Sequence, residues 1–169
     1  MLRTAPQSVL NSMASANSSL CIIGTDQKII DLPPFAYLND VSTFDGRSYA
    51  ELAGVGAVVG APETAVIEAN LLWLNTDGYT SSYGYYEVIT VHEMAHAIED
   101  IGISADALSA AQQAFNSSLA RRLGNFSKAN STPYAWQNFE ENWAVMTEAR
   151  FNSTTRTDIN AGINTPQKV

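Results

Sequence analysis

The hydrophobic positions along the first half of the chain predict one helix and several short strands. Apolar residues recur at helical spacing within 6–16, whereas compact apolar runs at 20–23 and 29–32 end at turn residues and indicate extended segments. A glycine-containing stretch, 54–60, leads into the best predicted strand, Thr64 to Leu74, where polar and apolar residues alternate over the first half. This half of the chain should therefore form a small sheet.

The second half is predicted to be mostly helical. From Tyr85 to Ile101 apolar residues recur every three to four positions, and Gly102 follows where a helix should end. A second apolar stripe predicts a helix from Ala105 to Leu123, and a third helix is predicted after Pro133. The stretch VHEMAHAIED, residues 91–100, therefore lies inside a helix.

Length and composition are those of one ordinary domain. The chain has 169 residues, of which 46% are hydrophobic, and this is enough to bury a core. From residue 152 the sequence is polar and lacks periodicity, as a surface tail does. We expect a single domain over residues 1–151, a polar C-terminal tail over 152–169, and a monomer.

Charge and cysteine content exclude several kinds of function. With a formal net charge of -8 and only nine lysines and arginines, which are scattered, the chain lacks the basic patch that binds nucleic acid. No apolar run approaches the ~20 residues of a membrane span. Cys21 is the only cysteine, so an intramolecular disulfide and a zinc site of several thiolates are both excluded. Any metal must be held by His, Asp or Glu.

Five N-x-S/T triplets bear on where the protein acts. In a secreted eukaryotic protein they would be glycan acceptors, which favours a secreted or extracellular location. The first residues lack the charged and apolar regions of a signal peptide, and a chain rich in Asn and Ser also makes such triplets by accident, so a cytoplasmic location is the alternative. The triplets begin at Asn17, Asn116, Asn125, Asn130 and Asn152.

The only two histidines of the chain, His92 and His96, are four residues apart. Residues at this spacing share one face of a helix, roughly 6 Å apart, so both rings can point at one metal ion. Glu93 is rotated by about 100° from His92, the offset at which a carboxylate misses the ion but reaches a water beside it. This H-E-x-x-H arrangement is typical of zinc hydrolases.

A third protein ligand must come from another element. Glu99 and Asp100 lie about a turn of helix, ~5 Å, too far along the axis to join the two histidines. Glu140 and Glu141 are adjacent in the helix predicted after Pro133, and only one of them can face inward. The spacing alone leaves both as candidates.

Three motifs resemble those of the gluzincin peptidases of the anthrax-lethal-factor and Pro-Pro-endopeptidase type. HEMAHAIED resembles their H-E-x-x-H-A-[IV]-D helix, and the pattern from Tyr134 through Asn138 and Glu141 to Trp143-Ala144 resembles their Y-x3-N-x2-E-[FY]-[FW]-A helix. The stretch 46–56, GRSYAELAGVG, resembles the G-K-[TS]-[YW]-D-[DE]-[VI]-P-G-[LI]-G segment before their active-site strand. The likeness covers roughly residues 44–151, with the motifs in the same order.

The resemblance implies an α+β, zincin-like catalytic domain. In such a domain a small twisted mixed sheet packs on the HExxH helix, and a second helical part carries the third zinc ligand. By that resemblance His92, His96 and Glu141 would hold one Zn²⁺ per chain, Glu93 would be the general base, and Tyr134 would face the reacting carbonyl.

Two positions depart from the family pattern. The family's proline before Gly-x-Gly is Ala53 here, which bears on substrate choice, and its acidic residue one turn past the third ligand is Val145. The second change removes a carboxylate that would hydrogen-bond a ligand, and Glu148 or Glu140 would have to replace it.

A donor to the oxyanion of the reaction is also needed. Some zincins use a histidine, but both histidines are assigned to the metal, and this points independently to a tyrosine. We predict Tyr134 in this role. The alternative donors are Tyr79, Tyr83, Tyr85 and Tyr86.

The substrate-binding residues are predicted from the strand at Thr64–Leu74. If that strand is an exposed sheet edge, a peptide can add to it, and Val66, Glu68 and Asn70 would bind substrate. The alternative is an interior strand, in which case Glu68 and Asn70 would only border the cleft.

The sequence thus predicts a zinc-dependent endopeptidase acting on a peptide or protein substrate. One alternative is a zinc hydrolase that cuts a different bond. Another is a binding or toxin-associated module with a structural zinc, which the presence of Glu93 disfavours because a structural site needs no base.

Overall fold

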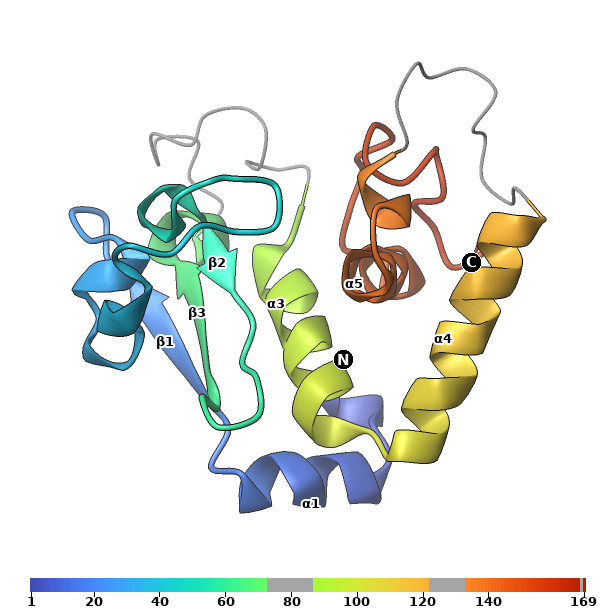
Figure 1. The fold of residues 1–169 in the computed structure, drawn as a ribbon, viewed down its shortest axis with the longest axis horizontal. Coiled ribbons are helices and arrows are strands. Elements are labelled where there is room, and N and C mark those ends of the chain that lie inside the picture. Colours follow the sequence, from blue (N-terminus) through green and yellow to red (C-terminus); the bar gives the residue numbers. More distant parts are fainter. Residues whose placement is uncertain (73–86, 122–132, 168) are drawn as a thin grey trace.

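The protein has an α+β fold in which a small mixed sheet and a group of helices lie side by side (Figure 1). The structure is a computed structural model that describes residues 1–72, 87–121, 133–167 and 169. The strands β1, β3 and β2 lie on one side of helix α3, and helices α5 and α4 lie on its other side. The fold class predicted from the sequence is confirmed at this level.

The sheet has the order β1-β3-β2, with β1 (Ser19–Ile23) parallel and β2 (Gly54–Val55) antiparallel to the central strand β3 (Glu63–Ile67). Of the two alternatives for Thr64–Leu74, the interior strand is therefore the one found in the described residues, and the exposed edge is wrong, because β3 is paired on both sides. The strand also ends sooner than predicted, since helix α2 (Glu68–Leu71) begins at the next residue.

A main hydrophobic core packs against the sheet. It is built by β1, β3, the start of α3 and two 3-10 helices, Ile29–Asp31 and Pro33–Leu38. The extended segment predicted at 29–32 is thus a helical turn, which is closed by a hydrogen bond of 2.8 Å from Lys28 N to Asp31 Oδ2. The most buried apolar members of this core are Ile23, Ile29, Phe35, Ala65 and Val66.

The predicted helices are all present in the described residues, with shorter bounds. Ser104 caps α4 by accepting from Ala107 N, and Asn138 caps α5 by accepting from Glu141 N. None of the helices in the described ranges has the length and apolar character needed to cross a membrane. The helices are α1 (Gln7–Ser15), α3 (Ile89–Ala97) with a π-helical continuation at Ile98–Gly102, α4 (Ala105–Ala120), and α5 (Phe139–Arg150) after a 3-10 turn at Tyr134–Trp136.

The C-terminal segment is packed on the domain and is not the surface tail that was predicted. Asn160 is fully buried, and Ile159 and Ile163 pack against the core between α4 and α5. Several of its polar side chains are hydrogen-bonded internally, for example by the 2.9 Å bond from Asn160 Nδ2 to the carbonyl oxygen of Arg156. A polar composition is therefore compatible with burial here, because the buried side chain of Asn160 both donates and accepts hydrogen bonds.

Candidate metal centre

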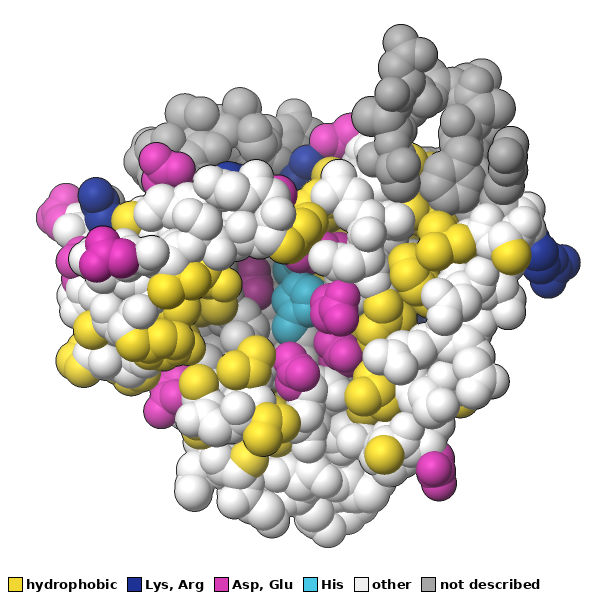
Figure 2. Space-filling model, in the orientation of Figure 1, with side chains coloured by type: hydrophobic (Ala, Val, Ile, Leu, Met, Phe, Trp, Pro, Cys, Tyr) yellow, Lys and Arg dark blue, Asp and Glu magenta, His cyan; other side chains and the backbone are white. Residues whose placement is uncertain are grey.

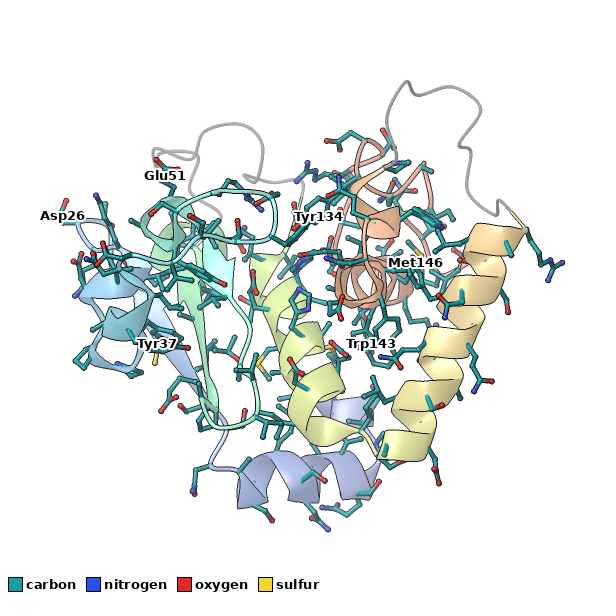
Figure 3. The ribbon with its side chains drawn as sticks, viewed as in Figure 1. Asp26, Tyr37, Glu51, Tyr134, Trp143 and Met146 are labelled. Atoms are coloured by element: carbon teal, nitrogen blue, oxygen red, sulfur yellow. The ribbon has the colours of Figure 1, made fainter. Side chains whose placement is uncertain are left out.

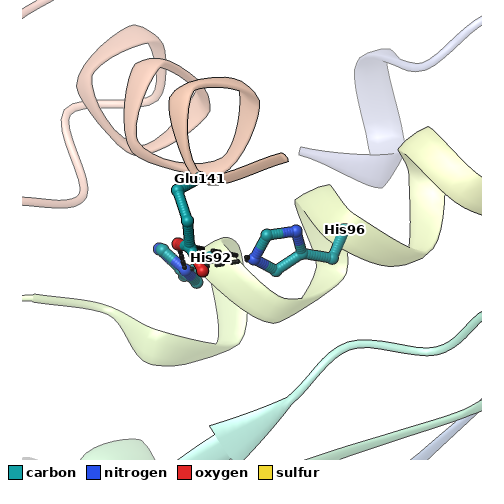
Figure 4. Close-up of side chains that lie close together, drawn as sticks. All are labelled: His92, His96 and Glu141. Atoms are coloured by element: carbon teal, nitrogen blue, oxygen red, sulfur yellow. Dashed lines mark hydrogen bonds and ion pairs between the residues drawn. The ribbon is translucent and has the colours of Figure 1, made fainter. Parts of the chain in front are cut away.

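His92, His96 and Glu141 converge at one point between α3 and α5 (Figure 4). His92 Nε2 lies 3.2 Å from His96 Nε2 and 3.2 Å from Glu141 Oε2. The distance from His96 Nε2 to Glu141 Oε2 is 3.9 Å. Three donor atoms from two helices thus face a common centre, and the two histidines do share one helix face as their spacing predicts.

These donors fit a tetrahedral zinc ion. Zinc bonds of about 2.0–2.2 Å to imidazole nitrogen and carboxylate oxygen place neighbouring donors roughly 3.3–3.6 Å apart. The three separations lie close to that range. In addition, Glu141 Oε2 is buried, and no partner in the described part of the chain offers it a hydrogen bond of good geometry. A buried carboxylate oxygen is costly to leave unpaired, and a cation would satisfy it.

The local sequence at the start of α5 directs Glu141 inward. Asn138 is the N-cap, and its side-chain oxygen accepts from Glu141 N at 2.8 Å, which fixes the first turn. Glu141 is buried, whereas Glu140 is exposed. The structure thus brings Glu141, and not Glu140, to the histidines.

Glu148 supports the ring of His92 from behind. Its Oε1 lies 2.5 Å from His92 Nδ1, and the side chain is fully buried. Because a carboxylate accepts, this contact keeps a proton on Nδ1 and turns Nε2 toward the other donors. Val145 is a buried apolar residue, so the carboxylate is supplied one turn later on α5, by one of the two replacements that the sequence suggested.

Burial and neighbouring charge set the ionisation of the two rings. Burial opposes the charged form of His92, but hydrogen bonds to Glu141 and Glu148 outweigh it and hold the pKa of His92 well above its ordinary value. Burial, together with the charge of His92, lowers the pKa of His96 to about 4. His96 is therefore neutral at pH 7 and can offer a lone pair.

The pKa values of the two carboxyl groups Glu141 and Glu93 are shifted in opposite directions. Burial raises the pKa of Glu141, but the hydrogen bond and charge of His92 reverse this and leave the pKa below its ordinary value. Burial raises the pKa of Glu93 to about 8, although the charge of His92 opposes the rise. Without a metal ion, Glu93 is therefore largely protonated at pH 7.

Strand β2 passes directly over the histidine helix, which explains two glycines of the 46–56 stretch. A Cβ atom at Gly56 would lie 2.4 Å from His96 Cβ, and one at Gly54 would lie 2.7 Å from Glu93 Cγ. A side chain at Gly54 would have to displace the side chains of Glu93 and Ile89, and one at Gly56 would have to displace β2 or the helix itself. The two glycines of the G-x-G pattern therefore allow the edge of the sheet to pack closely against α3.

Tyr134 lies on the 3-10 turn before α5 and extends toward the cleft (Figure 3). It is half-buried, and its phenol interacts with the Glu141 carboxylate; burial, followed by this carboxylate, raises the pKa of the phenol. Phe44 lies against it, with 6.2 Å between the ring centroids. The alternative donors Tyr79, Tyr83, Tyr85 and Tyr86 lie outside the described residues.

The site opens into a cavity of about 380 Å³. Figure 2 shows a histidine at the base of this cleft, with acidic side chains beside it and hydrophobic side chains on its rims. Besides the metal-site residues and Glu93, the residues that line it are Thr43, Phe44, Asp45, Arg47, Tyr49, Leu52, Ala53, Gly54, Val55, Gly56, Glu87, Ile89, Tyr134, Arg156 and Ile159.

The three residues predicted to bind substrate do not line this cavity. Val66 is fully buried in the sheet, and Glu68 accepts a hydrogen bond from Thr25. Asn70 is buried, where it donates to Glu87 O at 2.8 Å and accepts from Ile89 N at 2.9 Å. Asn70 therefore fixes the start of α3 and so positions the histidines indirectly.

Several residues that line the cavity were not predicted from the sequence. Phe44 is exposed and lies in a turn-rich stretch, while Arg156 and Ile159 belong to the segment predicted to be a tail. Glu87 stands just before α3 and gave no signal of its own. Only the proximity of Glu87 to the HExxH stretch could have drawn attention to it.

No known protein-family profile matches this chain, and no curated protein matches it either.

Proposed function

We propose that this protein is a zinc-dependent endopeptidase with a zincin-like catalytic domain of the gluzincin type. The observation that carries the proposal is the convergence of His92 Nε2, His96 Nε2 and Glu141 Oε2 at separations suited to zinc. Glu93 adjoins this group and lines the same cavity. A structural metal site would have no use for such a carboxylate.

The arrangement of elements supports the same proposal. The edge of the sheet packs on α3 through the close contacts of Gly54 and Gly56, and α5 carries the third donor from the other side. These are the parts that the resemblance to lethal-factor-type gluzincins requires. They come from the three motifs on which the resemblance rests.

Each residue would have a distinct part in hydrolysis. A bound zinc ion would supply Lewis acidity, polarising the peptide carbonyl and acidifying the attacking water. Glu93 would take the proton of that water on its carboxylate and hold it for the leaving amine. The nearby positive charge would lower the pKa of Glu93 from about 8, so that the carboxylate is ionised at pH 7. Tyr134 would donate its phenolic proton in a hydrogen bond to the oxyanion.

The substrate would bind along β2 and not along β3. Gly54 and Val55 line the cavity, and among the described strands β2 pairs with β3 on one side only. An extended peptide can therefore hydrogen-bond to the free side of β2 and pass over Glu93. This orientation follows from the sheet order, which places β3 in the interior.

The proposal is tested by metal analysis and by digestion of a peptide library. Protein purified without added metal should contain one zinc per chain, and it should cleave peptides in a reaction that a chelator stops and zinc restores. Glu93→Gln should keep the zinc but lose about 10²–10⁴-fold in hydrolysis, because only the base is removed. Glu140→Gln, which changes the exposed neighbour of Glu141, serves as the control and should remain active. Zinc binding without cleavage of any peptide would instead favour a structural site or a different bond.

A further inference from the structure

Arg156 links the C-terminal segment to the start of the histidine helix. Its NH1 lies 2.7 Å from Glu87 Oε2, and its Nε and NH2 lie 3.1 and 2.8 Å from the two carboxylate oxygens of Asp158. The Arg156 side chain is largely buried, with 16% of its surface exposed, and it lines the cavity. The guanidinium is thus held on two sides within the site.

Glu87 is placed where it could compete with Glu148 for His92. Its Oε1 lies 3.9 Å from His92 Nδ1, the atom that Glu148 contacts at 2.5 Å. Donor atoms of Glu87, His92 and Glu148 all lie within 4.8 Å of one another, and all three residues are buried. Two buried carboxylates this close repel each other, and either could accept the proton of Nδ1.

The backbone holds Arg156 in register with both helices that carry metal donors. Val88 N donates to Ser153 O at 2.9 Å, and Ser153 N donates to Glu148 O at 2.9 Å. Glu87 and Thr154 form an isolated antiparallel bridge. The segment therefore connects the start of α3 to the end of α5, immediately before Arg156.

We propose that Arg156 is a positioning residue of the metal centre, which pairs with Glu87 and thereby leaves His92 Nδ1 to Glu148. In this arrangement the guanidinium compensates one of the two buried carboxylates. The other carboxylate then fixes the tautomer and the direction of the His92 ring. Without Arg156, Glu87 would lose the compensation of its buried charge and would turn toward Nδ1, because its Oε1 already lies 3.9 Å from that atom.

The test compares the zinc affinities of single and double variants of the full chain. The inference rests on the proposed function, because it requires the chain to bind zinc. Arg156→Met should weaken zinc binding about 10–100-fold, the usual effect of losing a residue that supports a ligand. Glu87→Gln combined with Arg156→Met should restore the affinity to within about threefold, because the competing charge has gone. Ile163→Ala is the control for loosened packing of the same segment, and it should lower stability but leave zinc affinity unchanged.

A second readout needs no metal. The short contact of His92 Nδ1 with Glu148 should give a low-field proton signal in the NMR spectrum of metal-free protein. The signal should disappear in Glu148→Gln, shift in Arg156→Met, and return in the double variant. If Arg156→Met is too unstable to study, Arg156→Lys can replace it, both alone and together with Glu87→Gln. It should show a smaller effect in the same direction.

The outcomes separate this inference from the proposed function. A wild-type chain that binds no zinc would end both proposals. Normal zinc binding by the wild type, with an unchanged affinity in Arg156→Met, would end only the role of Arg156. A double variant as weak as Arg156→Met would show that Glu87 is not the competitor, and it would overturn the inference as well.

Discussion

Trp143 donates from its indole Nε1 to the carbonyl oxygen of Ala95, 2.9 Å away, and this bond joins the two helices of the candidate metal centre. Trp143 lies two residues after Glu141, and Ala95 lies next to His96. The bond therefore spans α3 and α5 at the level of the donors. It helps to hold the two helices together beside the three candidate donors.

Replacing Trp143 with Phe should therefore affect both stability and metal binding. Loss of the hydrogen bond should reduce the free energy of unfolding by about 1–2 kcal/mol and leave the carbonyl of Ala95 without this donor. Zinc affinity should fall with it, since α5 is no longer held at a fixed distance. Denaturant unfolding and zinc competition measure the two effects. Met146→Leu, in the same helix, should leave zinc affinity unchanged; equal affinities in both variants would refute the role of this bond.

Glu141→Gln should lose zinc far more readily than Glu140→Gln. The first change removes the charge from a buried oxygen that faces both histidines, whereas the second alters an exposed side chain. Zinc retention during dialysis against a chelator distinguishes them. If Glu140→Gln were the variant that lost zinc, the wrong carboxylate would have been assigned.

Tyr134→Phe should lower kcat by about 10²-fold or more, with little change in KM or zinc content. The phenol would bind charge that exists only after attack on the carbonyl, so it contributes little to the bound substrate. Steady-state kinetics on a peptide found in the library digest give both parameters. Tyr49→Phe, which alters another tyrosine of the cavity, should keep its kcat. Full activity of the Tyr134 variant would direct attention to Tyr79, Tyr83, Tyr85 and Tyr86.

Gly56→Ala should disturb the metal centre although the change adds a single methyl group. The new Cβ would lie 2.4 Å from His96 Cβ, so β2 or α3 must move. We expect a loss of about 1–3 kcal/mol in the free energy of unfolding, as for an overpacked core, together with weaker zinc binding. Gly24→Ala is the matched control, because its Cβ would meet only the movable end of Gln27. A stable Gly56→Ala protein with normal zinc affinity would contradict the close packing described above.

Glu99→Gln should make the protein more stable at high pH only. Burial, with the charges of Asp100 and Glu140, raises the pKa of Glu99 to about 7 from 4.5, and its Oε2 is buried without a hydrogen-bond partner in the described residues. Folding therefore favours the protonated form, and this stabilising contribution is complete below pH 4.5 and lost as the pH rises through 7. The variant should exceed the wild type by about 1–2 kcal/mol at pH 8 and equal it at pH 4. Thermal unfolding at the two pH values checks this, and a difference independent of pH would disprove it.

The local sequence pattern was sufficient to predict those features that depend on residues close to one another along the chain. Helical periodicity predicted α1, α3, α4 and α5, because the side chains that form an apolar face are three or four residues apart. The same spacing placed His92 and His96 on one face. The choice of Glu141 over Glu140 required the resemblance of a whole motif, because two adjacent carboxylates offer no local distinction.

The sheet order was decided by tertiary contacts. Strand β3 contacts β1, which lies over forty residues earlier, and β2, which lies much nearer, and the alternation within β3 does not encode either pairing. Both neighbours are needed to know that β3 is central. The predicted substrate-binding role of Val66 and Asn70 depended on the opposite assumption, and they are buried.

The sequence by itself determined the two histidines, the glutamate between them and the helix that presents them, since all of these lie within one helical segment. The comparison of motifs named Glu148 and Glu140 as possible supports of a ligand, but only the tertiary structure showed that Glu148 contacts His92, across 56 positions, and that Arg156 holds Glu87 beside them. These polar side chains carry no hydrophobic periodicity, so nothing in the local pattern marks them as buried. Their burial is tolerated only because each finds an oppositely charged or hydrogen-bonding partner, and those partners are brought close by folding.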